Sequence, residues 1–275
     1  MGENVLNIDV CIPTKNSSKT IKECLDSLLI AGIPINKLII VDASIDNTKE
    51  IISKWCNNKN IKYLILNQVG EGVGSARQTA LNNVETPIFA SVDSDVILTD
   101  GWYNKISDYM ILDYVVVASG FLYFGNKGGA MYKFIDWKRR NYIFHLTLGN
   151  CLINTEKIIS LGGFNKTYNS SEDTELYEEK VLKSNYKWIL DRGIIAYNPR
   201  GLVEELKHSF WYGKHYNGSI LRAIMRVGGS VIYGAQIMIT EYHYDVFFFL
   251  PIRMFVWFMG LIYGKTLRLI PDLDR

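Results

Sequence analysis

Apolar runs alternate with amphipathic segments along the first third of the chain. Short apolar runs rich in β-branched residues indicate strands, and segments with apolar residues at helical spacing separate them. The expected strands span residues 5–13, 37–41, 61–66 and 87–92, and the expected helices span residues 18–30, 46–58 and 75–83. Because strands that alternate with helices form parallel sheets, the pattern predicts an α/β fold, with a mainly parallel sheet and helices on both faces.

Polar residues or glycines follow each of these strands. They are Thr14 and Asn16, Asp42, residues 70–77, and Asp93 with Asp95. Each alone is typical of a turn or a helix cap. Together they predict a binding edge, because ligands of open parallel sheets lie at the carboxyl ends of the strands. A nucleotide suits this edge, since Asp42 can accept from a base or ribose hydroxyl and Arg77 can bind a diphosphate as a fork.

Asp93 and Asp95 end the fourth apolar run one residue apart. Residues i and i+2 at the end of a strand project to one side, so both carboxylates are expected to face the same point. Oxygen ligands of this kind suit Mg²⁺ or Mn²⁺ that carries the phosphates of a substrate. The alternative is an Asp-rich turn without metal.

Composition limits the class of protein. The chain has 275 residues, of which 48% are hydrophobic and 21% charged, as in a folded protein. A net charge of +2 gives no indication of nucleic-acid binding. The four cysteines lack the spacing of a metal knuckle or redox pair and are expected to be reduced core residues. Charged residues interrupt the N-terminus before any adequate apolar run, so we expect an intracellular protein.

An acidic stretch and a basic one mark the second half. Residues 170–176 open an expected helix, where Glu172 and Asp173 would either cap exposed amides or carry chemistry. Residues 138–140 are all basic and form either a solvated helix face or a contact to phosphate or lipid.

Four short motifs together carry a family resemblance. They span residues 13–16, 41–48, 72–77 and 93–95, in the order and approximate spacing of the family 2 glycosyltransferases, which have the Rossmann-like GT-A fold. The resemblance covers roughly residues 5–215. It implies a nucleotide-diphosphate sugar donor, inversion at the anomeric carbon, and a divalent cation, Mn²⁺ or Mg²⁺. The chain departs from the family at Gln78, where Asn is common, and at Ser17, where an acid is common.

The resemblance also implies roles for individual residues. Asp173 corresponds by position to the catalytic base, and Glu172 precedes it. Asp93 and Asp95 are the implied metal ligands, and His208 is the expected third ligand, with a packing role in an aromatic loop as the alternative. The expected substrate-binding residues are Pro13, Thr14, Asn16, Asp42, Gly74, Arg77, Asp93, Ser94 and Lys214.

The last part of the chain is unusually apolar. Residues 246–263 approach the length of a membrane span, but a central arginine, Arg253, costs about 2.5–3.5 kcal/mol at the bilayer centre. We therefore expect residues 245–270 to lie on a membrane surface, with packing on the core or on a second subunit as the alternative. The expected division is a catalytic domain, 1–215, and a C-terminal helical appendage, 216–275.

The sequence thus predicts a glycosyltransferase at the cytoplasmic face of the membrane. Its acceptor would be a hydroxyl on a polyprenyl-linked or polysaccharide glycan, and a homo-oligomer is left open. One competing hypothesis is a sugar nucleotidyltransferase, which would carry a Gly-rich, Arg-containing loop after the first strand, where this chain has residues 13–16. The other is a membrane-bound scaffold of the same fold without activity.

Overall fold

A computed structural model describes residues 7–141, 146–168, 171–216 and 219–269. The chain forms two compact units. The first, called the sheet unit, comprises Met1–Leu122 and His145–Tyr197. The second, called the helical unit, comprises Tyr123–Phe144 and Asn198–Arg275.

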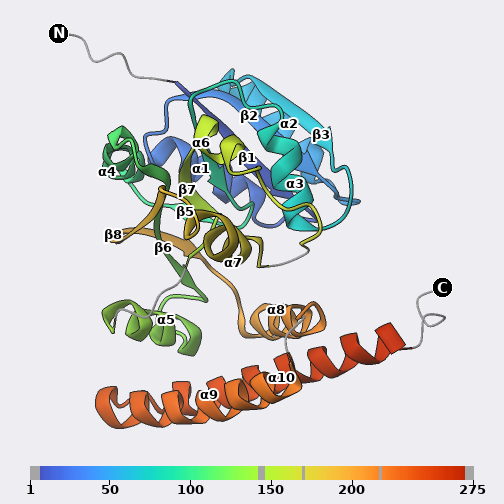
Figure 1. The fold of residues 1–275 in the computed structure, drawn as a ribbon, viewed down its shortest axis with the longest axis vertical. Helices are drawn as coiled ribbons and strands as arrows, with labels where there is room; N and C mark the ends of the chain where they lie inside the picture. Colours follow the sequence, from blue (N-terminus) through green and yellow to red (C-terminus); the bar gives the residue numbers. More distant parts are fainter. Residues whose placement is uncertain (1–6, 142–145, 169–170, 217–218, 270–275) are drawn as a thin grey trace. The chain divides into compact units, whose positions relative to one another are not determined.

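The sheet unit is built on a mixed sheet whose order is β3-β2-β1-β4-β7-β6-β8-β5 (Figure 1). Its strands are β1 (Ile8–Thr14), β2 (Ile35–Asp42), β3 (Tyr63–Asn67), β4 (Ile88–Val92), β5 (Ile97–Leu98), β6 (Val115–Phe124), β7 (Asn150–Asn154) and β8 (Lys187–Asn198). The first four strands pair in parallel. β7 pairs antiparallel with both β4 and β6, and β5 pairs antiparallel with β8.

Helices cover both faces of this sheet. The helices of the unit are α1 (Ile21–Ile30), α2 (Thr48–Lys59), α3 (Gly72–Leu81), α4 (Trp102–Ser107), α6 (Thr155–Ser160) and α7 (Glu172–Glu175), with the short turns η1 (Asp108–Ile111) and η2 (Leu176–Val181). Side chains of α3, α6 and η2 share one buried cluster with Cys11, Ile39 and Phe89 of the sheet. Because side chains alternate along a strand, the buried Val10 and Ile40 face the other side of the sheet.

The predicted α/β fold with a Rossmann-like sheet is confirmed, and the details differ in two places. Helix α3 begins at Gly72, three residues before the expected start at residue 75. The expectation of an aromatic loop around His208 is wrong, because residues 202–214 form helix α8. The side chain of Asn154 caps α6 by accepting from the Lys157 amide at 3.0 Å. The four cysteines are free and buried, as predicted.

The helical unit contains α5 (Ala130–Arg140), α8 (Leu202–Lys214), α9 (Ile220–Glu241) and α10 (Tyr244–Leu269). The boundary predicted at residue 215 stays a prediction; this unit also takes in residues 123–144. Helices α9 and α10 are each long and apolar enough to cross a membrane by length and composition. Only 22% of the most apolar stretch of α9 and 33% of that of α10 is buried, whereas the core helix of a soluble protein is mostly buried.

Glycines bring α8 and α10 into backbone contact. A Cβ atom at Gly260 would overlap the carbonyl oxygen of Phe210, and one at Gly264 would overlap that of Lys214. A side chain at Gly213 would overlap the carbonyl oxygen of Trp257 in the same way. Small residues four apart on a helix let two backbones approach closely. Gly260 and Gly264 therefore fix the place where α8 crosses the C-terminal half of α10.

We predict that Gly260→Ala lowers the thermal stability of the protein in mild detergent, because the added methyl group forces α8 and α10 apart at a cost of about 1–3 kcal/mol. Gly228→Ala is the matched control, since nothing lies within 4 Å of a Cβ at this position of α9. Its gain in helix propensity predicts an unchanged or slightly higher melting temperature. Equal melting temperatures for Gly260→Ala and the wild type would contradict the packing described here.

Candidate active site

The carboxyl ends of the parallel strands lie together, as the sequence predicts. Thr14 at the end of β1 pairs with Asp42 at the end of β2, and Asp42 in turn pairs with Asn67 of β3. The loop after β4 joins this edge through its Ser94, whose hydroxyl lies 2.8 Å from that of Ser17. Four separate stretches of sequence therefore meet at one edge of the sheet.

Asp42 is buried and has several protein partners. Its carboxylate accepts from the Thr14 hydroxyl at 2.5 Å and from both the amide and the hydroxyl of Ser44, at 3.0 and 2.7 Å. The Lys49 ammonium lies 3.6 Å away. This carboxylate thus ties the loop after β1 to the loop after β2. Its predicted contact with a base or ribose stays a prediction.

Asn16 joins the same two loops from the other direction. Its backbone φ of +53° is left-handed, a conformation that Asn tolerates better than most residues. Its amide donates to the Ser44 hydroxyl at 2.7 Å, and its side-chain oxygen accepts from the Ile45 amide at 3.0 Å. Pro13, the other predicted binding residue here, belongs to strand β1. The loop after β1 is therefore held in one shape without a ligand.

Asp93 and Asp95 are both partly exposed at this edge. The Asp93 amide donates to the carbonyl oxygen of Gly149, 3.1 Å away, at the point where β4 meets β7. A Cβ atom at Gly149 would overlap the Asp93 carboxylate, so only glycine leaves room for it. With 31% of its side chain exposed, Asp93 keeps one side open to a ligand.

Arg77 of α3 lies at the centre of the site. Its Nη2 donates to Asp93 at 2.7 Å, and its Nε donates to Glu172 at 3.0 Å. Its Nη1 donates to the Ser91 hydroxyl at 2.9 Å and to the carbonyl oxygen of Leu148 at 3.4 Å. Only 4% of the side chain is exposed. The guanidinium that was expected to bind diphosphate therefore holds two carboxylates together, and diphosphate binding by it stays a prediction.

Two opposing effects act on the pKa of the Arg77 guanidinium. Burial lowers this pKa, but the negative charges of Asp93 and Glu172 and their hydrogen bonds together raise it by a larger amount. The net effect is a raised pKa, so Arg77 remains charged. A buried charge is tolerated only when paired, and here the two carboxylates pair with it.

Glu172 and Asp173 begin α7, directly after Ser171, whose φ of +64° marks a sharp turn in the backbone. Glu172 is buried against Arg77, so an ion pair, and not helix capping, accounts for its position. Asp173 is partly exposed, and its carboxylate accepts from the Thr174 amide at 2.7 Å. Burial and the charge of Glu172 raise the pKa of Asp173 to about 7. A carboxylate with this pKa suits general-base chemistry near neutral pH.

Gly74 and Gln78 attach α3 to the segment before α7. The amide of Gly74 donates to the carbonyl oxygen of Tyr168 at 3.2 Å, and a Cβ at Gly74 would overlap the carbonyl oxygen of Asn165. The close approach that Gly74 permits is therefore to the protein's own backbone. Gln78 accepts from the Phe164 amide at 2.7 Å, which gives a structural reason for this departure from the family.

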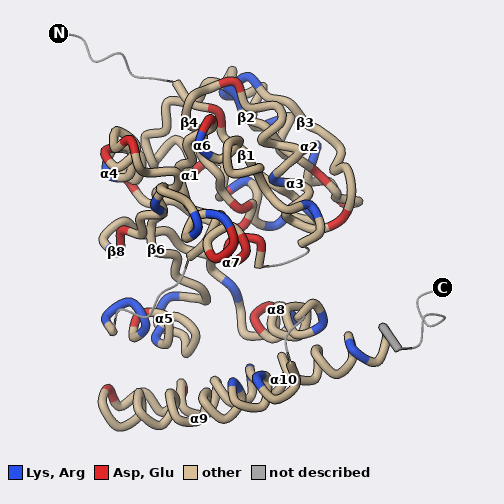
Figure 2. The backbone as a smooth tube through the Cα atoms, in the orientation of Figure 1, with Lys and Arg blue, Asp and Glu red and all other residues tan. Residues whose placement is uncertain are grey.

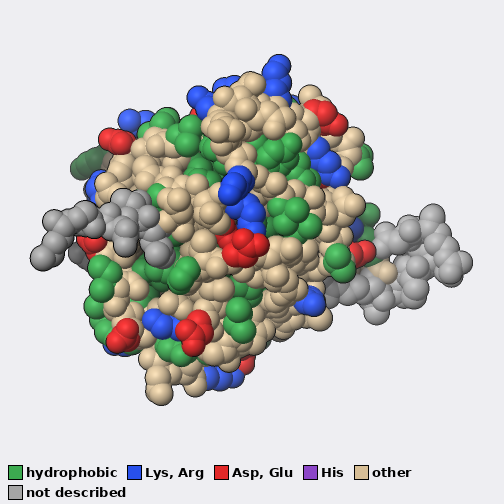
Figure 3. Space-filling view, turned by 90° about the horizontal axis from the view of Figure 1, so that it is seen from above, with side chains coloured by type: hydrophobic (Ala, Val, Ile, Leu, Met, Phe, Trp, Pro, Cys, Tyr) green, Lys and Arg blue, Asp and Glu red, His purple; other side chains and the backbone are tan. Residues whose placement is uncertain are grey.

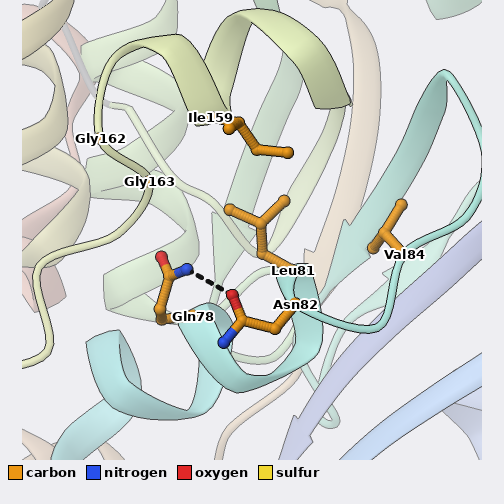
Figure 4. A pocket seen from close by; sticks show the side chains of 7 residues that line it. All are labelled: Gln78, Leu81, Asn82, Val84, Ile159, Gly162 and Gly163. Atoms are coloured by element: carbon orange, nitrogen blue, oxygen red, sulfur yellow. Dashed lines mark hydrogen bonds between the residues drawn. The ribbon is translucent and has the colours of Figure 1, made fainter.

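A shallow pocket lies on the same side of α3 as Gln78. Its volume is about 310 Å³, and it is lined by Gln78, Leu81, Asn82, Val84, Ile159, Gly162 and Gly163 (Figure 4). The Gln78 amide donates to Asn82 at 2.8 Å across its floor. None of the predicted site residues lines it, so we assign the chemistry to the carboxyl edge of the sheet and not to this pocket.

His208 and Lys214 both belong to α8 of the helical unit. The rings of His208 and Tyr212 lie 6.1 Å apart, and the Lys214 ammonium lies over the Tyr263 ring. Among the described residues, no group of three His, Cys, Asp or Glu side chains is arranged to hold a metal. Asp93 and Asp95 of the sheet unit are both partly exposed, and their role as ligands of a divalent cation stays a prediction. Carboxylate oxygens are the kind of ligand that Mg²⁺ and Mn²⁺ take together with phosphates and water.

Ser91 and Gly149 contribute to the site and were not predicted. Ser91 accepts from Arg77, and Gly149 makes room for Asp93. The spacing offered a signal for the first of them, because Ser91 lies two residues before Asp93, at the point where β4 ends. Asp95 follows in a turn and does not continue the strand. Gly149 offered none, since its role depends on the antiparallel pairing of β7 with β4.

The arrangement resembles that of solved sugar transferases. A mannosyltransferase from Pyrobaculum calidifontis, solved with GDP-Man and Mn²⁺, gives a TM-score of 0.58 at 15% identity, over 98% of this chain and 77% of that one. TarS residues 1–349 from Staphylococcus aureus, solved with UDP-GlcNAc, give a TM-score of 0.55 at 19% identity, over the same shares. These likenesses confirm the expected GT-A fold.

The profile of glycosyl transferase family 2 matches residues 9–170, more than half of the chain, and the chain belongs to this family. Poly(ribitol-phosphate) β-N-acetylglucosaminyltransferase TarS from Staphylococcus aureus is 35% identical over 94 residues, 33% of this chain and 16% of that protein. Glycosyltransferase GlyA from Streptococcus pneumoniae is 28% identical over 132 residues, 46% of this chain and 18% of that protein. The matches thus span less than a fifth of these two relatives.

The raised pKa of Asp173 predicts a pH dependence of stability. The folded protein holds this proton up to pH about 7, whereas the unfolded chain releases it near pH 4. The wild type should therefore lose stability relative to Asp173→Asn as the pH rises from about 4 to about 7. Urea unfolding of both proteins across this range measures the difference, in which the titrating groups far from Asp173 cancel. A difference that is flat over this window, or that changes only below pH 4, would contradict the raised pKa.

Proposed function

We propose that the protein transfers a sugar, with inversion, from a nucleotide-diphosphate sugar to a hydroxyl acceptor. The contact of Arg77 with both Asp93 and Glu172 carries this proposal. It links the carboxylates suited to a metal-bound diphosphate to the turn that bears the candidate base, Asp173. If the ion pairs of Arg77 served the fold alone, they would not need a neighbouring acid such as Asp173, which is partly exposed and has a raised pKa. An acid of this kind is typical of functional sites.

Asp173 is the base in this proposal. Its carboxylate takes the proton of the acceptor hydroxyl while that oxygen forms a bond to the anomeric carbon. The bond between the anomeric carbon and the diphosphate oxygen breaks on the opposite face, and the nucleoside diphosphate leaves with the bonding electrons. Glu172 contributes by position: paired with Arg77, it fixes the turn that aims Asp173.

Asp93 and Asp95 would hold the divalent cation, Mn²⁺ or Mg²⁺. When bound, the cation supplies positive charge that stabilises the leaving diphosphate. Mn²⁺ is named with the solved Pyrobaculum mannosyltransferase and with GalNAc-T7, which supports a cation here as well. His208 as a third ligand and Lys214 as a phosphate contact remain part of the proposal.

The donor and acceptor are proposed by class. UDP-GlcNAc and GDP-Man are named with the solved relatives, so a nucleotide-diphosphate sugar suits this chain. The acceptor would be a hydroxyl of a polyprenyl-linked or polysaccharide glycan. We place the reaction at the cytoplasmic face of the membrane, because α9 and α10 expose long apolar surfaces. A homo-oligomer stays open.

Asp173→Asn should reduce sugar transfer by at least a hundredfold, because general-base catalysis typically contributes 10²–10⁴-fold. Binding of the donor should be unchanged, since Asn keeps the shape of the side chain. Product formation from a panel of nucleotide sugars with Mn²⁺, followed by chromatography, measures transfer, and calorimetry measures donor binding.

Glu178→Gln is the control for this variant, as it removes an exposed acid one turn away. It should transfer at the wild-type rate. Transfer by Asp173→Asn at a rate similar to that of the control would show that Asp173 is not the base. A wild type that binds no nucleotide sugar with Mn²⁺ would overturn the proposed function itself.

A further inference from the structure

The face of α10 that points away from α8, called its outward face, is mainly apolar. It carries the exposed side chains of Tyr244, Phe248, Ile252, Phe255, Met259, Ile262 and Tyr263. These residues recur at helical spacing on one side of the helix. Phe248, for example, is 65% exposed. Figure 2 shows long uncharged stretches in both α9 and α10.

The inward face of α10 carries the polar features. Arg253 donates to Glu205 of α8 at 2.7 Å, with only 4% of the Glu205 side chain exposed. The glycines that contact α8 lie on this face as well. This distribution is the reverse of a soluble amphipathic helix, whose apolar side faces the protein and whose charged side faces water. The surroundings that suit such an outward face are hydrocarbon.

Helix α9 extends the same apolar surface. It runs antiparallel to α10, because Gly234 packs on Phe247 while Ala223 packs near Leu261. Its exposed apolar residues are Ile220, Leu221, Ile224, Met225, Val231, Ile232 and Ile239. By contrast, the face of the molecule seen in Figure 3 mixes basic, acidic and hydrophobic side chains.

The helical unit is the basic part of the chain. The helical unit has 14 Lys and Arg against 7 Asp and Glu, a formal charge of +7, and the sheet unit has 16 against 21, a charge of −5. Exposed Arg222 and Arg226 lie on α9 itself. Anionic headgroups attract basic groups next to an apolar surface, at about 1 kcal/mol for each Lys or Arg near the surface.

Charged helices accompany α10 along its length on the inward side. At its start, Lys133 of α5 pairs with Asp245 at 2.8 Å, and Arg140 of the same helix pairs with Glu241 at the end of α9. Helix α8 continues this cover from Arg253 to Gly264. A spanning α10 would carry these charged helices into the bilayer, where each charge near the centre costs about 2.5–3.5 kcal/mol on the insertion scale.

We infer that α9 and α10 form a flat hairpin that lies in one leaflet of an anionic membrane without crossing it. Their outward apolar face enters the hydrocarbon boundary, and α5 and α8 remain on the aqueous side. This inference rests on the proposed membrane attachment and specifies its geometry. The occupant of the apolar face is thus lipid and not a second copy of the chain.

The test adds the full-length protein to preformed vesicles of phosphatidylcholine, with or without 30% phosphatidylglycerol. Flotation should show binding, strengthened several-fold by the anionic lipid, with the increase lost in 0.5 M NaCl. Phe255→Glu should weaken binding at least tenfold. Ile111→Glu, at an exposed apolar residue of the sheet unit, is the matched control and should bind as the wild type does. Equal binding by Phe255→Glu and Ile111→Glu would overturn the assigned face.

Labelling of one added cysteine then shows whether the hairpin lies on the membrane or crosses it. The native cysteines are buried, so the added one is expected to react first. In the flat hairpin, His243→Cys between α9 and α10 reacts with an impermeant maleimide outside the vesicles and not with one sealed inside. Phe255→Cys becomes protected only when vesicles are present. Labelling of His243→Cys from the inside would overturn the flat geometry while leaving attachment intact.

Two further outcomes also count against the inference. A wild type that binds neither kind of vesicle overturns attachment, and the transfer assay with a soluble acceptor would still decide the enzymatic proposal. Protection of Phe255→Cys in buffer alone, together with a concentration-dependent dimer in gel filtration, identifies a second copy as the occupant.

Discussion

The buried guanidinium of Arg77 is the constraint on which the sheet unit's site depends. It is one positive charge shared between two carboxylates that are 79 residues apart in the sequence, Asp93 and Glu172. Removing either partner leaves buried charge without compensation, which is why such a network has few alternative arrangements. It therefore fixes both the strand end with the candidate metal ligands and the turn with the candidate base. The raised pKa of Asp173 follows from its burial and from the charge of the neighbouring Glu172.

Much of the fold was accessible from the sequence, because strand and helix periodicities in residues 8–98 are strong and local. The meeting of Thr14, Asp42 and Asp93 at one edge followed from the parallel order of the strands. The burial of Arg77 did not follow, since its partners come from β4 and α7. Helix α8 was also missed around His208, where aromatic residues obscured the helical period. Its crossing with α10 depends on glycines, which carry no hydrophobic signal.

The two units combine different physical designs. The sheet unit buries its apolar side chains and exposes its charges, as soluble proteins do. The helical unit buries the Glu205 carboxylate against a partly exposed Arg253, and it exposes aromatic side chains of α10. In water such an outward surface is unfavourable, so it needs a partner. The proposed transfer to a lipid-linked glycan would gain from the proposed attachment, because attachment would concentrate the protein where such an acceptor lies.

A double-mutant cycle on Arg77→Met and Glu172→Gln, read by urea unfolding of the full chain, tests the central claim most directly. If one shared charge holds the site, the two changes are coupled by roughly 1–3 kcal/mol, because either one alone leaves a buried group without its partner. Effects that add to within about 0.5 kcal/mol would contradict the account, since independent residues behave in that way.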